Sequence, residues 1–172
     1  TIAVSARLND GSGAFGDNQG HVRIYHWDGL LWNQLGQDID GEGLNNFSGW
    51  STSLTYDGSR IAIGAHTNSG NGSYSGHVRV YDWNGSSWIQ LGGDIDGESA
   101  NDESGFSVSL SSDGNILAIG APDNDGNGSN SGHVRVYNWN GSSWIQIGND
   151  IDGEHLLIRV VIQFLLIVMG QY

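Results

Sequence analysis

Residues 76–98 read GHVRVYDWNGSSWIQLGGDIDGE, and the same block returns at 132–154 as GHVRVYNWNGSSWIQIGNDIDGE. A third copy, GHVRIYHWDGLLWNQLGQDIDGE, occupies 20–42, so the copies are spaced 56 residues apart in both intervals. The copies at 76–98 and 132–154 differ at only three positions, 82/138, 91/147 and 93/149. Such a match is not a coincidence of composition, and self-similarity at a fixed period is typical of repeat architectures.

One repeat contains four runs of strand length, which in the last repeat are Phe106–Ser111, Ile116–Ala121, His133–Trp139 and Ser143–Gly148. Asp-Gly and Asn-Gly pairs separate the runs and supply the positive φ that short hairpin turns need. Four antiparallel strands at this period are typical of a propeller blade. We therefore predict an all-β chain of the β-propeller type, with four-stranded antiparallel blades of 56 residues in an incomplete ring.

The alternation of side chains predicts how the blades pack. In residues 77–83, HVRVYDW, the valines share one face of the strand, and His, Arg, Tyr and Trp share the other. We expect neighbouring blades to cover both faces. The run LAIGA at 117–121 is apolar on both faces, as expected of an inner strand near the axis, where Gly and Ala allow close approach.

The repeat divides the chain into four parts. Residues 1–48 form a first blade without its first strand together with a connecting loop, 49–104 a second blade with its loop, and 105–154 a third blade. Residues 155–172 form an apolar tail unrelated to the expected continuation.

We expect the tail to be a frameshift product of a fourth repeat. If the tail is written in suitable synonymous codons and the reading frame is shifted by one base, it translates as AFVDKSGYSVFVDSDGSV. This sequence restores the SG-aromatic-SV and SDG elements in register with the preceding repeats. The alternative is a membrane anchor. It is disfavoured because the apolar stretch 156–169 is shorter than the roughly 20 residues of a spanning helix and contains Arg159 and Gln163.

Composition excludes some functions and leaves others open. The formal net charge is −13, and all six cations are arginines, so binding to nucleic acid or to anionic lipid is not expected. The absence of cysteine excludes disulfides but not any compartment. About three blades cannot close a ring of four to eight, so we expect self-association, for example a dimer that completes a six-bladed ring, or use of the apolar tail as a substitute strand.

Two short elements resemble a known family. Gly105-Phe106-Ser107-Val108 and Ile119-Gly120-Ala121-Pro122, followed by the strand that begins at Gly132, resemble the FG-GAP repeat of integrin α-subunit propellers and of many bacterial and algal surface proteins. The resemblance implies a non-enzymatic extracellular or cell-surface interaction or adhesion scaffold with a protein or glycan ligand. The family's calcium loop is not carried over, because residues 111–115 are too few and too poor in acids.

The Asp-Ile-Asp-Gly-Glu motif supplies the first candidate metal site. Its two aspartates share a strand face and its glutamate follows a bend, so together they could gather oxygen ligands for Ca²⁺. The favoured alternative is an Asp-Gly turn between the outer strand and the next blade. The carboxylates concerned are Asp38, Asp40, Glu42, Asp94, Asp96, Glu98, Asp150, Asp152 and Glu154.

Other candidates have a structural interpretation beside the functional one. Asp123 and Asp125 resemble the first half of an EF-hand loop without its distal glutamate, so a surface turn is favoured. His21, His77 and His133 occupy one repeat position, one per blade, and are expected to be too far apart to share a metal unless they face the axis. The favoured role is a strand histidine hydrogen-bonded beside Arg and Tyr. Ca²⁺ is thus the only cofactor that these patterns suggest.

The paired tryptophans admit two interpretations. As cross-strand pairs flanking hairpin turns they would stabilise each blade by roughly 0.5–1.5 kcal/mol beyond area burial. The alternative is a sugar-stacking platform on a lectin-like propeller, formed by Trp32, Trp88 and Trp144.

No enzyme is predicted. The sequence contains no nucleophile elbow, no Cys/His pairing and no sialidase-type box. A propeller hydrolase is therefore less favoured than an interaction scaffold or a lectin-like propeller. Ligand binding is expected in the loops Glu98–Ser104 and Asp123–Ser131 and their counterparts.

Overall fold

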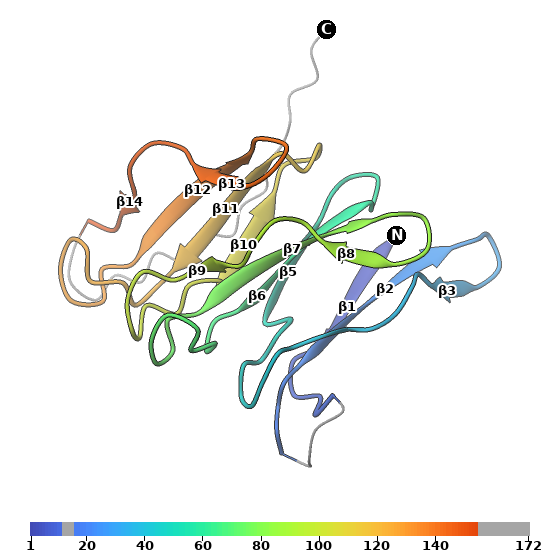
Figure 1. Cartoon of the computed structure of the whole chain (residues 1–172), viewed down its shortest axis with the longest axis horizontal. Helices are drawn as coiled ribbons and strands as arrows, with labels where there is room; N and C mark the ends of the chain where they lie inside the picture. Colours follow the sequence, from blue (N-terminus) through green and yellow to red (C-terminus); the bar gives the residue numbers. More distant parts are fainter. Residues whose placement is uncertain (12–15, 155–172) are drawn as a thin grey trace, which may run out of the picture.

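The computed structural model describes residues 1–11 and 16–154, and within these it contains fourteen β-strands and no helix. The strands form three separate antiparallel sheets that succeed one another along the chain (Figure 1). Within the described residues, therefore, no helix has the length and apolar character needed to cross a membrane. The frameshift prediction concerns 155–172, which lie outside the described residues.

Each sheet is one blade. Blade 1 contains β1 (Ile2–Ala6), β2 (His21–Trp27), β3 (Trp32–Gln34) and β4 (Ile39–Asp40). Blade 2 contains β5 (Ser51–Leu54), β6 (Arg60–Ala65), β7 (His77–Trp83), β8 (Trp88–Gln90) and β9 (Ile95–Asp96). Blade 3 contains β10 (Ser107–Leu110), β11 (Ile116–Ala121), β12 (His133–Trp139), β13 (Trp144–Gln146) and β14 (Ile151–Asp152).

The order within a blade is a meander with one addition. Strands β5, β6, β7 and β8 pair in sequence, and β9 pairs with β7 beyond the end of β8. The sequence predicted four strands and a turn at the acidic motif, whereas the Ile-Asp pair of that motif forms a fifth, two-residue strand. Because β8 pairs only with Tyr81–Trp83, the first residues of β7 have a free edge, which Ile95 and Asp96 occupy opposite Val78 and His77.

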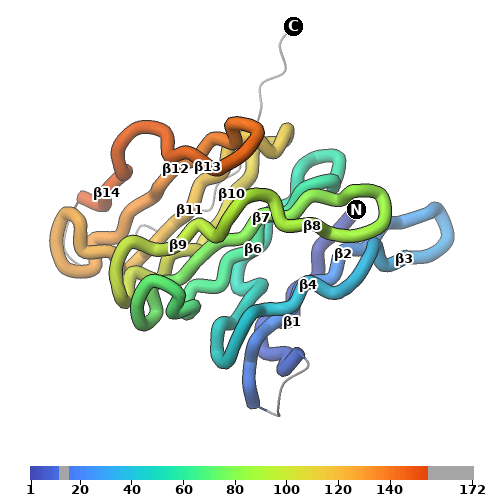
Figure 2. Tube along the Cα trace, viewed as in Figure 1, coloured from blue at the N-terminus to red at the C-terminus, as the bar shows by residue number. Residues whose placement is uncertain are grey.

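The hydrophobic core lies between the blades. One cluster joins Val22 and Ile24 of blade 1 to Ile61, Ile63 and Trp88 of blade 2. A second cluster joins the opposite face of blade 2 to blade 3 through Ala62, Val78, Val80, Ile95, Leu110, Leu117, Ile119 and Tyr137. The predicted alternation is thus confirmed, since the two valines of β7 face blade 3, and Tyr81 and Trp83 pack toward blade 1. Figure 2 shows the three sheets fanned out in chain order.

Blades 2 and 3 approach most closely along their inner strands. The Ser51 hydroxyl donates a hydrogen bond of 2.7 Å to the carbonyl of Gly105 across the boundary. A Cβ added to Gly64 would lie 2.1 Å from that same carbonyl oxygen, a distance that no side chain tolerates. The glycines of the two short elements therefore let one backbone pass directly over another.

An aromatic column accompanies this contact. The Trp50 ring lies 4.1 Å from the His66 ring and 5.4 Å from the Phe106 ring, measured between centroids. The Arg7 guanidinium lies 4.4 Å from the centroid of Trp50, as a cation–π contact. Burial, with a smaller contribution from the charge of Arg7, lowers the pKa of His66 to about 4. His66 is accordingly a neutral aromatic member of the column, which links all three blades.

We expect Gly64→Ala to lower the free energy of unfolding by about 2 kcal/mol or more, because the methyl group must push the Gly105 carbonyl away. Gly93→Ala is the matched control, because a Cβ there meets no atom within 4 Å. It should change stability by no more than about 0.5 kcal/mol. Urea unfolding followed by tryptophan fluorescence measures both values. Equal stabilities for the two variants would contradict the close approach.

Candidate functional site

The acidic motif divides its carboxylates between neighbouring blades. Asp94 accepts two hydrogen bonds of 2.8 Å from Arg79 of its own blade. Glu42, from the motif of blade 1, crosses the boundary to pair with the same Arg79, and its carboxylate lies 4.0 Å from Nδ1 of His77. The motif therefore does not fold its own three carboxylates into a chelate, and its glutamate joins one blade to the next.

The second boundary has the same arrangement of residue types. Nδ1 of His133 lies 3.9 Å from the Glu98 carboxylate of blade 2 and 3.5 Å from the Asp150 carboxylate of blade 3. Arg135 contacts Glu98 at 3.5 Å. Acidic and basic groups thus alternate across both boundaries beside the apolar clusters.

Ionisation follows from these contacts. Hydrogen bonds from Arg23 and Gln34 lower the pKa of Asp38 to about 2. Burial raises the pKa of Asp94, but hydrogen bonds from Arg79 and Gln90 outweigh it, so this pKa lies below its usual value. Burial also lowers the pKa of His77 and of His133, so both imidazoles are neutral near pH 7. The cationic partners of the carboxylates are therefore the arginines.

A polar cavity of about 330 Å³ lies beside the second boundary. The loops expected to bind ligand meet there, since its lining includes Glu98, Asp102, Asn124 and Asp125, together with Asp150. The Asn124 side chain donates a hydrogen bond of 3.0 Å to Asp102 and thereby ties one loop to the other.

The paired tryptophans differ in how far they are exposed. The ring centroids of each pair lie 5.4–5.5 Å apart. Trp88 is only 3% exposed, and its indole donates a hydrogen bond of 2.9 Å to the Leu35 carbonyl of blade 1. Trp144 does the same at 3.1 Å to the Leu91 carbonyl of blade 2. Trp32 is 49% exposed. Two of the three candidate sugar-stacking indoles are therefore inter-blade contacts, and Trp32 alone presents a large surface.

The comparison with protein families agrees with this architecture. The model of the FG-GAP repeat matches residues 95–137, from β9 to the middle of β12. Over these residues the chain is similar to an FG-GAP repeat. FG-GAP repeats build propeller-type domains that are often involved in adhesion, and the family is generally non-enzymatic. A search of curated proteins returned no significant match.

Within the three blades, the predicted metal-ligating residues fall into separate groups. Three clusters each bring ligand atoms of one histidine and two carboxylates within 4.8 Å of one another: His21/Asp38/Asp40, Glu42/His77/Asp94 and Glu98/His133/Asp150. The remaining candidates Asp96, Asp152, Glu154, Asp123 and Asp125 belong to none of these clusters. Among the described residues, no cluster contains all three carboxylates of one motif, and His21/Asp38/Asp40 contains two of them.

The pairing of the histidines with the carboxylates was not predicted from the sequence. The three histidines were expected to lie too far apart to share a metal unless they faced the axis, and each of them lies beside two carboxylates. Glu42 and Glu98 each precede a histidine of the next repeat by 35 residues, and Asp94 and Asp150 each follow that histidine by 17. Both spacings were visible in the sequence: pairing within a blade explains the 17-residue spacing, and only the stacking of blades explains the 35-residue spacing.

We expect Trp88→Phe to lower the free energy of unfolding by about 1–3 kcal/mol, because it leaves the Leu35 carbonyl without its donor. Trp32→Phe, at the equivalent but half-exposed position of blade 1, should change it by less than about 0.5 kcal/mol. Denaturant titration of both variants against the unaltered chain checks this. A loss at Trp32 as large as that at Trp88 would contradict the inter-blade role.

Proposed function

We propose that the chain is part of a non-enzymatic interaction scaffold of the extracellular space or cell surface, and that it binds a protein partner through one rim of its blades. The rim consists of the loops 42–48, 67–75, 98–104 and 123–131. The observation that carries the proposal is the convergence of the last two loops on one polar cavity. The FG-GAP repeat supports an adhesion role.

The rim is continuous from blade to blade. The Thr67 hydroxyl donates a hydrogen bond of 2.6 Å to the Asn45 carbonyl across the first boundary, as the Asn124 amide does to Asp102 across the second. Hydrogen bonds between successive loops give a partner one ordered surface instead of independent loops. Loops held on a rigid scaffold are the usual carriers of binding function.

The charge of the rim indicates the chemistry of the partner. Its four loops contain the acids Glu42, Glu98, Asp102, Glu103, Asp123 and Asp125 and no Arg or Lys. A surface with one sign of charge attracts an oppositely charged patch and accelerates association at low ionic strength. We therefore propose a partner with a basic, hydrogen-bonding surface.

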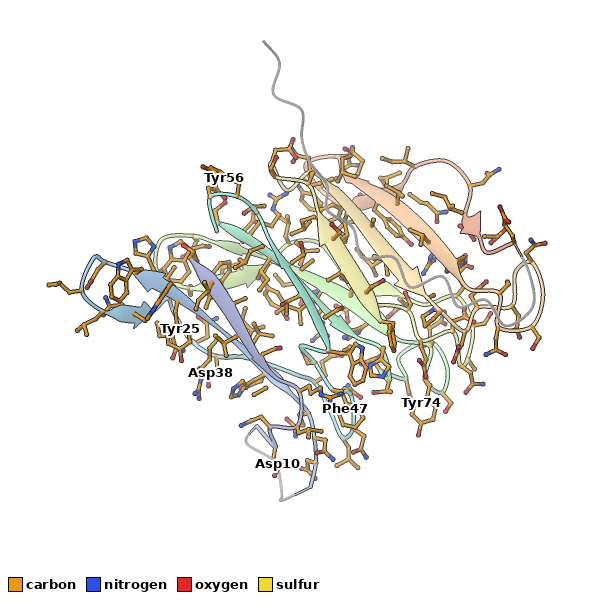
Figure 3. All side chains as sticks on the ribbon, turned by 180° about the vertical axis from the view of Figure 1, so that it is seen from behind. Asp10, Tyr25, Asp38, Phe47, Tyr56 and Tyr74 are labelled. Atoms are coloured by element: carbon orange, nitrogen blue, oxygen red, sulfur yellow. The ribbon has the colours of Figure 1, made fainter. Side chains whose placement is uncertain are left out.

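Tyr74 is the best candidate for a contact residue on the rim. Its side chain is 50% exposed, and tyrosine is enriched among residues that dominate interface energies. Figure 3 shows Tyr74 and Phe47 at one end of the blades and Tyr56 at the opposite end. Tyr56 is 94% exposed. The two tyrosines form a matched pair for testing which end binds.

Glycan binding is the second candidate, and Trp27 and Trp32 favour it. They are 45% and 49% exposed, and their rings are tilted with centroids 5.4 Å apart. Such a pair can stack on the apolar face of a sugar. In blade 2 the equivalent pair, Trp83 and Trp88, packs against blade 1. We therefore propose that a second copy of the chain stacks on the exposed face of blade 1 that carries Trp27 and Trp32.

The labelled chain, checked by light scattering for its oligomeric state, is applied to arrays of extracellular proteins and of glycans at low and high salt. We expect protein binding that weakens with salt, falls at least tenfold in Tyr74→Ala and persists in Tyr56→Ala.

Glycan binding abolished by Trp32→Ala would favour the second candidate. Binding to neither array, or protein binding lost in Tyr56→Ala and kept in Tyr74→Ala, would overturn the proposal.

A further inference from the structure

The cluster at the second boundary contains ligands from two blades. Glu98 follows β9 of blade 2, whereas His133 begins β12 and Asp150 precedes β14 of blade 3. Nδ1 of His133 is 3.5 Å from Asp150 and 3.9 Å from Glu98, and all three ligand atoms lie within 4.8 Å of one another.

His133 is directed into this cluster from the core. The residue is 1% exposed, and its Nδ1 has no hydrogen-bond partner among the described residues. A buried polar atom without a partner is costly, and each such atom in a native protein calls for an explanation. A bound cation would satisfy this nitrogen together with the two carboxylates.

In blades 1 and 2 an arginine pairs with the first aspartate of the acidic motif, whereas in blade 3 it does not. Arg23 and Arg79 each form a two-pronged hydrogen-bonded pair with the aspartate of their own motif, Asp38 and Asp94. Arg79 also reaches Glu42, so a guanidinium lies between the two carboxylates of that boundary.

Arg135 is oriented differently from its counterparts. One of its NH groups donates a hydrogen bond of 2.8 Å to the Asp96 carbonyl, and another lies 3.5 Å from Glu98. In the described part of the chain, the only side chain that donates a hydrogen bond to Asp150 is Gln146, at 2.6 Å. No arginine neutralises this aspartate, so the position between Asp150 and Glu98 is open to another cation.

We propose that Glu98, His133 and Asp150 bind one Zn²⁺ ion that clasps blade 2 to blade 3. Imidazole nitrogen with carboxylate oxygen is a donor set that suits zinc, whereas calcium takes oxygen ligands. Zinc bonds of about 2.0–2.2 Å place tetrahedral ligand atoms about 3.4 Å apart. His133 and Asp150 already have this separation, and Glu98, whose side chain is 44% exposed, is free to move inward.

The surroundings fit the ion. Gln146 holds the second oxygen of Asp150, as outer hydrogen bonds commonly orient metal ligands. The polar cavity that Glu98 and Asp150 line has a volume of about 330 Å³, which leaves room for water as a fourth ligand. The ion would perform between blades 2 and 3 the bridging that Arg79 performs between blades 1 and 2.

The test is a calorimetric Zn²⁺ titration of the full chain without a histidine tag, with thermal unfolding in parallel. We expect one Zn²⁺ per chain and a higher unfolding midpoint with zinc. Asp150→Asn should weaken the affinity at least tenfold. Asp94→Asn, the equivalent change in the cluster that Arg79 fills, should leave it unchanged. Co²⁺ as a spectroscopic probe should give visible absorption bands that Asp150→Asn removes.

Glu98→Gln provides a second variant at an exposed side chain, where loss of folding is not expected, and it should also weaken Zn²⁺ binding at least tenfold. Absence of Zn²⁺ binding to the unaltered chain would overturn the proposal. So would an affinity that stays the same in both Asp150→Asn and Glu98→Gln, or one that falls equally in Asp94→Asn. The readout does not involve the rim partner, so its result is independent of the proposed function.

Discussion

The structure depends on one constraint: a small antiparallel sheet with two apolar faces is stable only when both faces are covered. Each blade here is too thin to contain a core of its own, and the buried clusters lie between sheets. In blade 2 the side chains of β6 alternate, with Ile61 and Ile63 toward blade 1 and Ala62 toward blade 3. Nearest-neighbour contacts of this kind make the stability of a repeat protein a property of its interfaces.

The interfaces also determine where polar chemistry is placed. Every repeat carries the same histidine, arginine and acidic motif, and stacking brings the glutamate of one repeat to the histidine of the next. Nearly identical sequence nevertheless produces different electrostatics at the two boundaries. Arg79 bridges Glu42 and Asp94. Arg135 does not pair with Asp150, which instead contacts His133 and Gln146. The loops that project from these boundaries form the acidic rim.

The strands and their packing could be predicted from sequence because they depend on local patterns. Period-two alternation in β7 and Asp-Gly or Asn-Gly turns are properties of a few adjacent residues, and the 56-residue period repeats them. The fifth strand at Ile95–Asp96 escaped prediction because it exists only where β8 leaves the edge of β7 free. Two of the three histidine–carboxylate clusters escaped for a related reason, since their glutamate comes from the preceding repeat. The burial of Trp88 likewise follows from a neighbouring blade, whereas the equivalent Trp32 is half exposed.

Native-state hydrogen exchange tests the central claim most directly, because β2 and β7 have the same length and pairing partners but different coverage. Blade 2 has a described blade on each side, and blade 1 has one on a single side. The measurement is made where light scattering shows a monomer, so that no second copy covers blade 1. If stacking creates the core, the buried amides of β7 should then exchange at least tenfold more slowly than the equivalent amides of β2. Equal protection of the two strands, or faster exchange in β7, would show that each blade is stable by itself and would contradict the account.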